Sequence, residues 1–81
     1  MTREEVIKEF ENCLSSISHC RAGWDYELTR EQRAQEDRQE KISLALARRL
    51  WTDNAHMHAD LEAAFTAFQP LATMAEIQRT P

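Results

Sequence analysis

The sequence has 81 residues, 42% of them hydrophobic, and a formal net charge of −4 at pH 7, which fits one domain with a small core. Ten Lys and Arg against fourteen Asp and Glu leave no basic region of the kind that nucleic-acid binding needs. No apolar run approaches the ~18 residues of a transmembrane helix, and the charged N-terminus lacks the apolar segment of a secretory signal. We therefore expect a soluble, cytoplasmic protein that does not bind membranes.

The first predicted helix covers residues 2–22 and begins with a capping box formed by Thr2 and Glu5. Apolar residues then recur in alternating steps of four and three, the spacing of a coiled-coil seam. Gly23, the single glycine, is placed to cap the end of this helix, although the helix can alternatively continue through it. We expect the seam to form a homodimer contact, and it consists of Phe10, Cys13, Ile17, Cys20 and Trp24.

Two cysteines lie on this first helix, seven residues apart. That spacing separates their Cα atoms by ~10 Å along a helix, whereas a disulfide requires less than ~7 Å. The first interpretation is that Cys13 and Cys20 are small buried hydrophobic residues. In an antiparallel dimer centred near Ser16 and Ile17, however, Cys13 would oppose Cys20 of the second chain, so that oxidation would lock the dimer.

The second predicted helix covers residues 29–68 and also begins with a capping box, Thr29 with Gln32. Its first part, through Lys41, has almost no apolar residues, but its charge spacing supports an exposed helix. Two apolar stripes then follow the helix, which predicts two packing partners. One stripe consists of Ile42, Leu46, Leu50, Met57, Leu61, Phe65 and Phe68, and the other of Leu44, Ala47, Trp51, Ala55 and Ala59.

Residues 52–54, Thr-Asp-Asn, leave the continuity of this helix open, because Thr52 or Asp53 would make a good N-cap of a new helix. An unbroken helix of ~58 Å would need a second chain to cover it, whereas a broken one folds back as a three-helix bundle. A short helix at 73–79 follows, opened by Thr73 and Glu76. The predicted fold is one all-α domain over residues 1–81, a helical hairpin or three-helix bundle of long amphipathic helices, expected as a dimer.

No group of residues predicts catalysis or a cofactor. Ser15 and His19 lie four apart, but nothing supplies an oxyanion hole or a third orienting group. His56 and His58 lie two apart, so on a helix they point in nearly opposite directions and do not share a metal. We therefore expect no enzyme activity, no metal and no cofactor.

The two apolar stripes lead to the functional hypothesis of a small helical protein–protein interaction module. It would act as an adaptor, as an inhibitor (for example, a phage or bacterial inhibitor of a larger machine) or as a chaperone-like regulator by occluding a partner protein. One alternative is a redox- or metal-responsive regulator that uses the cysteines and histidines. A weaker one is a helical nucleic-acid-binding regulator. Because arginine and tryptophan are common at interface hot spots, the expected partner-binding residues are Leu44, Arg48, Arg49, Trp51 and Ala55.

Overall fold

The computed structural model describes residues 1–22 and 28–79, and the part that it describes is helical without strands. The predicted all-α class is therefore confirmed. The chain is 42 Å along its longest axis and 24 and 22 Å across. Its elements are α1 (Arg3–Arg21), α2 (Arg30–Asp53), a 3-10 turn η1 (Ala55–Met57), α3 (His58–Phe68) and α4 (Met74–Gln78).

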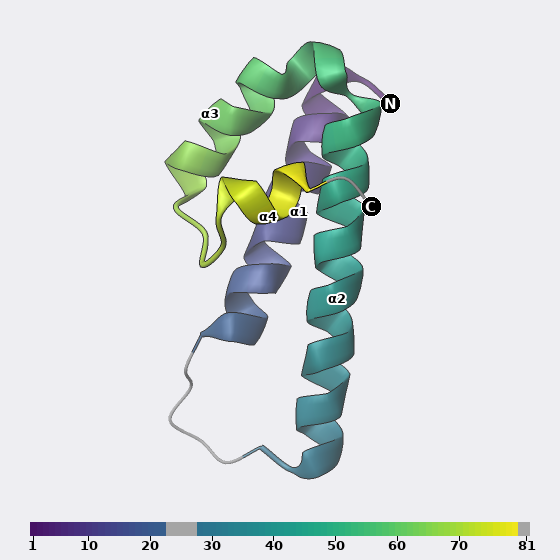
Figure 1. Cartoon of the computed structure of the whole chain (residues 1–81), viewed down its shortest axis with the longest axis vertical. Coiled ribbons are helices and arrows are strands. Elements are labelled where there is room, and N and C mark those ends of the chain that lie inside the picture. The colour runs from purple at the N-terminus through teal and green to yellow at the C-terminus, as the bar shows by residue number, and fades with distance from the viewer. Residues whose placement is uncertain (23–27, 80–81) are drawn as a thin grey trace.

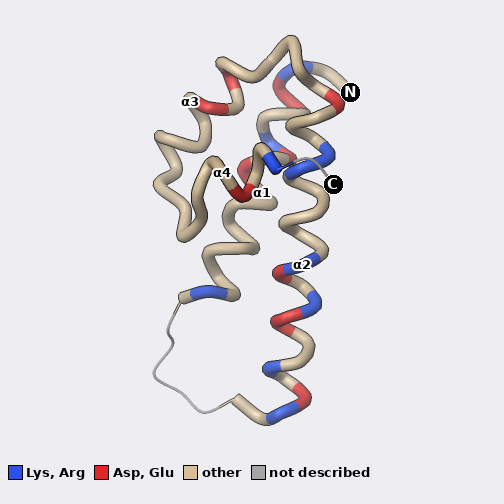
Figure 2. The backbone as a smooth tube through the Cα atoms, viewed as in Figure 1, with Lys and Arg blue, Asp and Glu red and all other residues tan. Residues whose placement is uncertain are grey.

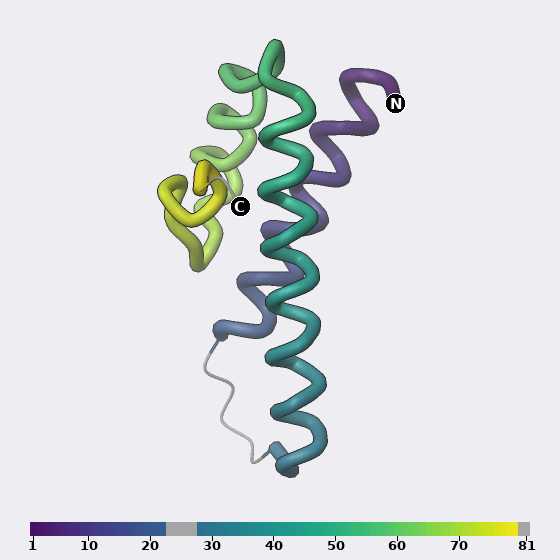
Figure 3. The backbone as a smooth tube through the Cα atoms, turned by 45° about the vertical axis from the view of Figure 1, so that its right-hand side comes forward, coloured from purple at the N-terminus to yellow at the C-terminus, as the bar shows by residue number. Residues whose placement is uncertain are grey.

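The helices form a hairpin with a shorter folded-back arm (Figure 1). Helices α1 and α2 run antiparallel and pack along their length, whereas α3 turns back at the end of α2 and packs against α1. Helix α4 then crosses back to pack on α2. The turned view shows α3 and α4 together on one side of α2, so the opposite side of α2 faces away from them (Figure 3).

Threonine caps begin three of the helices, as the sequence predicts. Thr29 and Thr73 form complete capping boxes, in which their hydroxyls accept from the third helical amide and their own amides donate to Gln32 and Glu76. Thr2 forms half of the motif: its hydroxyl accepts from the Glu5 amide at 3.2 Å and donates to the Glu5 carboxylate at 3.1 Å. Each cap satisfies an amide that the helix itself leaves without a partner.

Helix α2 ends at Asp53, so the structure selects the broken alternative. Thr52 and Asp53 are not N-caps of the next helix, contrary to the sequence interpretation; α3 begins after Met57 with no side-chain cap. Asn54 is instead the C-cap of α2: its amide makes the last helical bond, to the Leu50 carbonyl at 3.1 Å, and its side-chain Nδ2 donates to the same carbonyl at 2.9 Å. The side-chain bond competes with helix continuation, and the chain reverses through η1.

The C-terminal end of α3 is determined by Pro70. The helix ends at Phe68, where the sequence predicts it, because Pro70 disfavours helical geometry in the residue before it. Gln69 adopts a left-handed conformation with φ 54°, and its amide donates to the Phe65 carbonyl at 3.1 Å. This reversal directs residues 70–73 back toward α2, where α4 docks.

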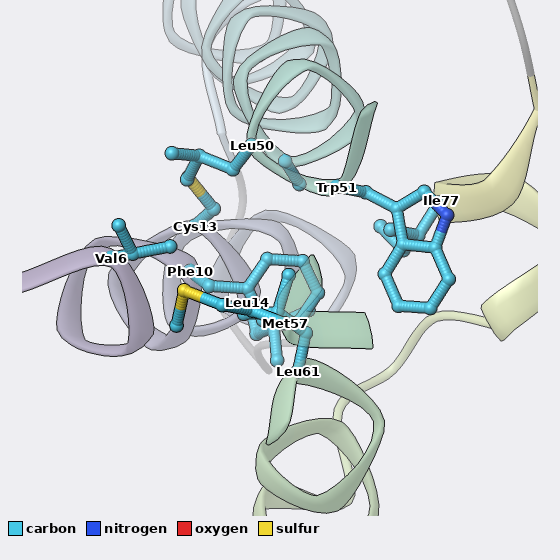
Figure 4. Packing of buried hydrophobic residues seen from close by; sticks show 10 residues of the cluster. Val6, Phe10, Cys13, Leu14, Leu50, Trp51, Met57, Leu61 and Ile77 are labelled. Atoms are coloured by element: carbon cyan, nitrogen blue, oxygen red, sulfur yellow. The ribbon is translucent and has the colours of Figure 1, made fainter. Parts of the chain in front are cut away.

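All four helices of the described residues contribute to the hydrophobic core (Figure 4). Phe10 and Leu14 of α1, Leu61 of α3 and Ile77 of α4 are completely buried, which makes the five-residue α4 part of the core rather than a loose tail. The core cluster consists of Val6, Phe10, Cys13, Leu14, Ala47, Leu50, Trp51, Met57, Leu61 and Ile77.

The predicted dimer seam on α1 is largely occupied by this intramolecular core. Phe10, Cys13 and Ile17 are buried within one chain, and Cys20 is half-buried. Phe10, Cys13 and Ile17 are thus packed within one chain and not exposed to a second one, and the homodimer stays a prediction. Helix α1 ends at Arg21 with Ala22 as its C-cap; the predictions for Gly23 and Trp24 lie outside the described residues.

Candidate docking surface

Trp51, the central residue of the predicted partner-binding set, lies in the core and is 8% exposed. Its ring stacks on that of His58, with centroids 3.7 Å apart and planes 9° from parallel. The Nε2 atom of His58 also lies 2.8 Å from the Trp51 carbonyl oxygen. Because α2 breaks, the folded-back arm covers the stripe that an unbroken helix would leave exposed. The folded-back arm of the same chain therefore covers Trp51, where the sequence predicts a partner protein.

The other predicted partner-binding residues do not form one free surface. Leu44 is partly buried against the core, and the Nε atom of Arg48 donates to the Glu76 carbonyl at 2.7 Å. Arg49 and Ala55 are exposed. Arg49 forms a surface ion pair with Asp53 at 3.5 Å, of a kind that contributes little to stability. Of the five residues, Arg49 thus remains on an open face of α2.

Arg21 holds the C-terminal arm against the hairpin. Its guanidinium forms a two-pronged ion pair with Glu76, at 2.7 and 3.1 Å, and also pairs with Glu40 of α2. It further donates to the Leu71 carbonyl at 2.9 Å. Hydrogen bonding with Arg21 is the main reason that the pKa of Glu76 falls to about 2, and the two carboxylates raise the pKa of Arg21 in turn. This clasp joins α1, α2 and α4.

The clasp predicts a loss of stability in acid. The pKa of Glu76 is lower in the folded chain than its ordinary value of 4.5, so its contribution is present above about pH 4.5 and disappears as the pH falls toward about 2. Since the pair is partly exposed, we expect about 1–2 kcal/mol. Urea unfolding at pH 6 and pH 3 should show this loss. In Glu76→Gln, most of the difference between the free energies of unfolding at the two pH values should disappear. Equal pH dependence in Glu76→Gln and in the exposed control Glu62→Gln would contradict the assignment.

The two cysteines lie in surroundings that favour the neutral thiol. Burial raises the pKa of the Cys13 thiol to about 11, with a smaller effect from Glu9. Burial also raises the pKa of the Cys20 thiol, followed by the carboxylates of Glu36, Glu40 and Asp37. Since the thiolate is the reactive form, both side chains are poor nucleophiles at neutral pH.

A hollow of about 400 Å³ lies beside Cys20, between the end of α1 and the start of α2. Within the described residues, no three His, Cys, Asp or Glu side chains are grouped to hold a metal ion. His56 is exposed, whereas His58 stacks on Trp51. The hollow is lined by Ser16, His19, Cys20, Leu28, Gln32, Gln35, Glu36 and Gln39.

The side of α2 opposite the core carries the clearest candidate site. Ile42 is 61% exposed and Leu46 41% exposed, and Ala45 lies exposed between them. Because residues three and four apart share a helix face, these side chains form a short apolar strip. We call this surface the outward face of α2 and define it as Arg38, Lys41, Ile42, Ala45, Leu46 and Arg49.

Two shallow grooves flank the outward face of α2, and Arg49 and Asp53 line both of them. One groove, of about 350 Å³, is lined by Ala45, Arg48, Arg49, Thr52 and Asp53. The other, of about 380 Å³, lies toward the N-terminus of the chain and is lined by Met1, Val6, Leu46, Arg49, Leu50, Asp53 and Asn54. The side-chain ridges of another helix can pack into grooves of this kind.

The sequence predicts that Ile42 and Leu46 pack as part of one apolar stripe, whereas both are exposed in the structure. Ser43 and Ala47 face α1 instead: the Ser43 hydroxyl donates to that of Ser16 at 2.8 Å, and Ala47 is completely buried. Small residues four apart allow two helices to approach closely. Ser16 on the first helix and Ser43 and Ala47 on the second were the sequence signal that α2 turns this side, and not Ile42 and Leu46, toward α1.

Comparisons with protein-family models, with curated proteins and with solved structures found no match. In the described part of the chain, no helix has both the length and the apolar character to cross a membrane.

Proposed function

We propose that this protein is a small protein-binding module that covers part of a partner protein, as an adaptor or inhibitor, through the outward face of α2. One observation carries the proposal: Ile42 and Leu46 are exposed next to each other on α2, the longest helix of the described residues, and two grooves lined by Ala45, Leu46 and Arg49 among others lie beside them. Single exposed apolar residues are common, but a contiguous patch indicates an interaction site.

The energetics support this choice of surface. Fully burying an isoleucine or leucine side chain contributes about 1.5–3 kcal/mol, and here Ile42 stays 61% and Leu46 41% exposed, so that part of this energy is not yet gained. Neither belongs to the core cluster, which is built from the other side of α2. A partner helix that covers both, together with Met1 at the edge, would recover this energy on binding.

The proposal is tested with a photo-crosslinking amino acid at Ala45, on the outward face of α2, and at Ala63 of α3 as a control. Both alanines are exposed helical residues, so the label disturbs them equally. We expect a discrete adduct with one protein from Ala45, in the cells that produce the chain, and none from Ala63. Adducts of equal yield from both positions, or none from Ala45, would contradict the proposal.

A substitution on the same face should separate binding from folding. We expect Ile42→Asp to remove the Ala45 adduct, because a carboxylate would have to be desolvated inside the interface. Since Ile42 is 61% exposed, its effect on the free energy of unfolding should stay below about 1 kcal/mol. Thermal unfolding followed by circular dichroism checks this. If Ile42→Asp leaves the adduct unchanged, the docking surface lies elsewhere.

A further inference from the structure

We infer that the segment that docks on the outward face of α2 is an acidic amphipathic helix, which rests on the proposed function. Arg38, Lys41 and Arg49 are all exposed and surround the apolar strip. Arg49 pairs with Asp53, whereas Arg38 and Lys41 form no ion pair with any other residue that the structure describes. The face therefore carries unpaired positive charge in a chain whose net charge is −4.

The cationic character is local to the part of α2 that begins at Arg38. From Arg30 to Asp37, basic and acidic residues are interleaved (Figure 2). From Arg38 to Asn54 the charged residues are Arg38, Glu40, Lys41, Arg48, Arg49 and Asp53, and Glu40 is turned inward to pair with Arg21. Asp53 is thus the one carboxylate of this stretch that borders the outward face of α2, and Asp37 lies just before it.

The shape of the surface fits a helix. Ile42, Ala45 or Leu46, and Arg49 follow one another at steps of three or four residues, so the strip runs along the axis of α2. The small side chain of Ala45 lets a second helix approach closely, and the flanking grooves take its side-chain ridges. A partner helix with an apolar ridge would place its bordering residues beside Arg38, Lys41 and Arg49. Carboxylates at those borders would complete the charge pairs.

The same face of a second copy is a poorer occupant. Parallel packing of two α2 helices would bring Arg38 to Arg38 and Arg49 to Arg49. Antiparallel packing that sets Ile42 on Leu46 of the other copy would bring Arg38 beside Arg49 of that copy, because both pairs have nearly the same mean position along the helix. Either arrangement opposes like charges, which weakens association.

Membranes and nucleic acids fit this surface less well. Helices that lie in a membrane interface carry a broad apolar side with aromatic residues, whereas this strip is short and has none. Phosphate groups would neutralise the cations but leave Ile42 and Leu46 in water, and the carboxylates of Asp37 and Asp53 would repel them.

Three synthetic peptides of about 21 residues test the inference. All three share one leucine ridge, and the flanking positions are glutamate, glutamine or lysine. We expect the glutamate peptide to bind at least about tenfold more tightly than the glutamine peptide by fluorescence anisotropy, and the lysine peptide to bind more weakly than both. Raising the salt from about 50 to about 500 mM should remove most of this difference.

A charge reversal on the protein provides the matched control. Arg38→Glu with Lys41→Glu should invert the preference, so that the lysine peptide binds best. Arg30→Glu with Arg33→Glu makes the same change in charge in the first turn of α2 and should leave the preference unchanged. Inversion by both double variants would show a long-range effect of net charge and would overturn the assignment to this face.

The remaining outcomes separate the inference from the proposed function. Equal binding of all three peptides would overturn the acidic preference but leave the outward face of α2 as a docking surface. If no peptide binds, the inference fails, and the Ala45 crosslink decides the proposed function independently. A doubled mass in light scattering that Ile42→Asp returns to the monomer value would make a second copy the occupant. Binding to vesicles with about 30% phosphatidylserine, without a preference among the peptides, would make it a lipid surface. Either result would overturn the inference.

Discussion

Replacing Trp51 with alanine is expected to lower the free energy of unfolding by about 3–5 kcal/mol. The indole is 8% exposed, belongs to the core cluster and stacks on His58. A chain of 81 residues has a total stability of only about 4–12 kcal/mol. The variant should therefore be partly or fully unfolded at 37 °C, which urea unfolding followed by circular dichroism measures.

The control for this prediction is Phe68→Ala, because Phe68 is an aromatic residue that is 37% exposed. It should cost about 1 kcal/mol or less. A Trp51→Ala variant as stable as the parent would show that α3 and α4 do not cover this stripe. Trp51 would then be available for docking, as the sequence alone suggested.

The second large effect is expected from Leu61→Ala, which should cost about 2–5 kcal/mol. Leu61 is completely buried because α3 folds back against α1. In an unbroken helix, Leu61 would lie beyond the end of α1 and would make no contact with it. Urea unfolding measures this cost: the midpoint should fall, while the dependence of the free energy of unfolding on urea concentration stays unchanged.

Leu71→Ala makes the same chemical change at a site that is 52% exposed, and it should change the stability by less than about 1 kcal/mol. A cost at Leu61 no greater than that at Leu71 would contradict the folded-back arm. A large cost at Leu61 that depends on protein concentration would instead indicate that another chain buries it.

The sequence was sufficient to predict the helix starts and the helical class, because these depend on local chemistry. Thr2, Thr29 and Thr73 each cap a helix through bonds within four residues. The stop at Phe68 likewise follows from Pro70, two residues later. Such signals need no knowledge of the rest of the chain.

The rotation of α2 and the manner of its break were not predictable in the same way. Apolar periodicity favoured Ile42 and Leu46 as core residues, but close packing of Ser43 against Ser16 turned them outward. Which residues of the two apolar stripes are buried depends on the helices that pack against α2, so it is decided by tertiary contacts. Asn54 was in the ambiguous triplet, yet its role as the C-cap of α2 follows only from its bond to the Leu50 carbonyl.

The candidate site was predicted in part. Arg49 belongs to both the predicted partner-binding set and the outward face of α2, because charged residues between apolar stripes stay at the surface. Trp51 was correctly placed on a second stripe that needs a packing partner. The partner is the chain itself, through His58 and Ile77. An internal arm satisfies the same sequence pattern as an external protein, and the pattern does not distinguish the two.

The account depends most directly on the reversal between α2 and α3, since it covers Trp51 and leaves the outward face of α2 open. Spin labels at Arg30→Cys and Thr66→Cys, in a chain with Cys13→Ala and Cys20→Ala, measure it by electron paramagnetic resonance. A continuous helix would separate these positions by ~54 Å, more than the 42 Å length of the folded chain. We predict a single distance well below 42 Å. A distance near ~54 Å would contradict the account.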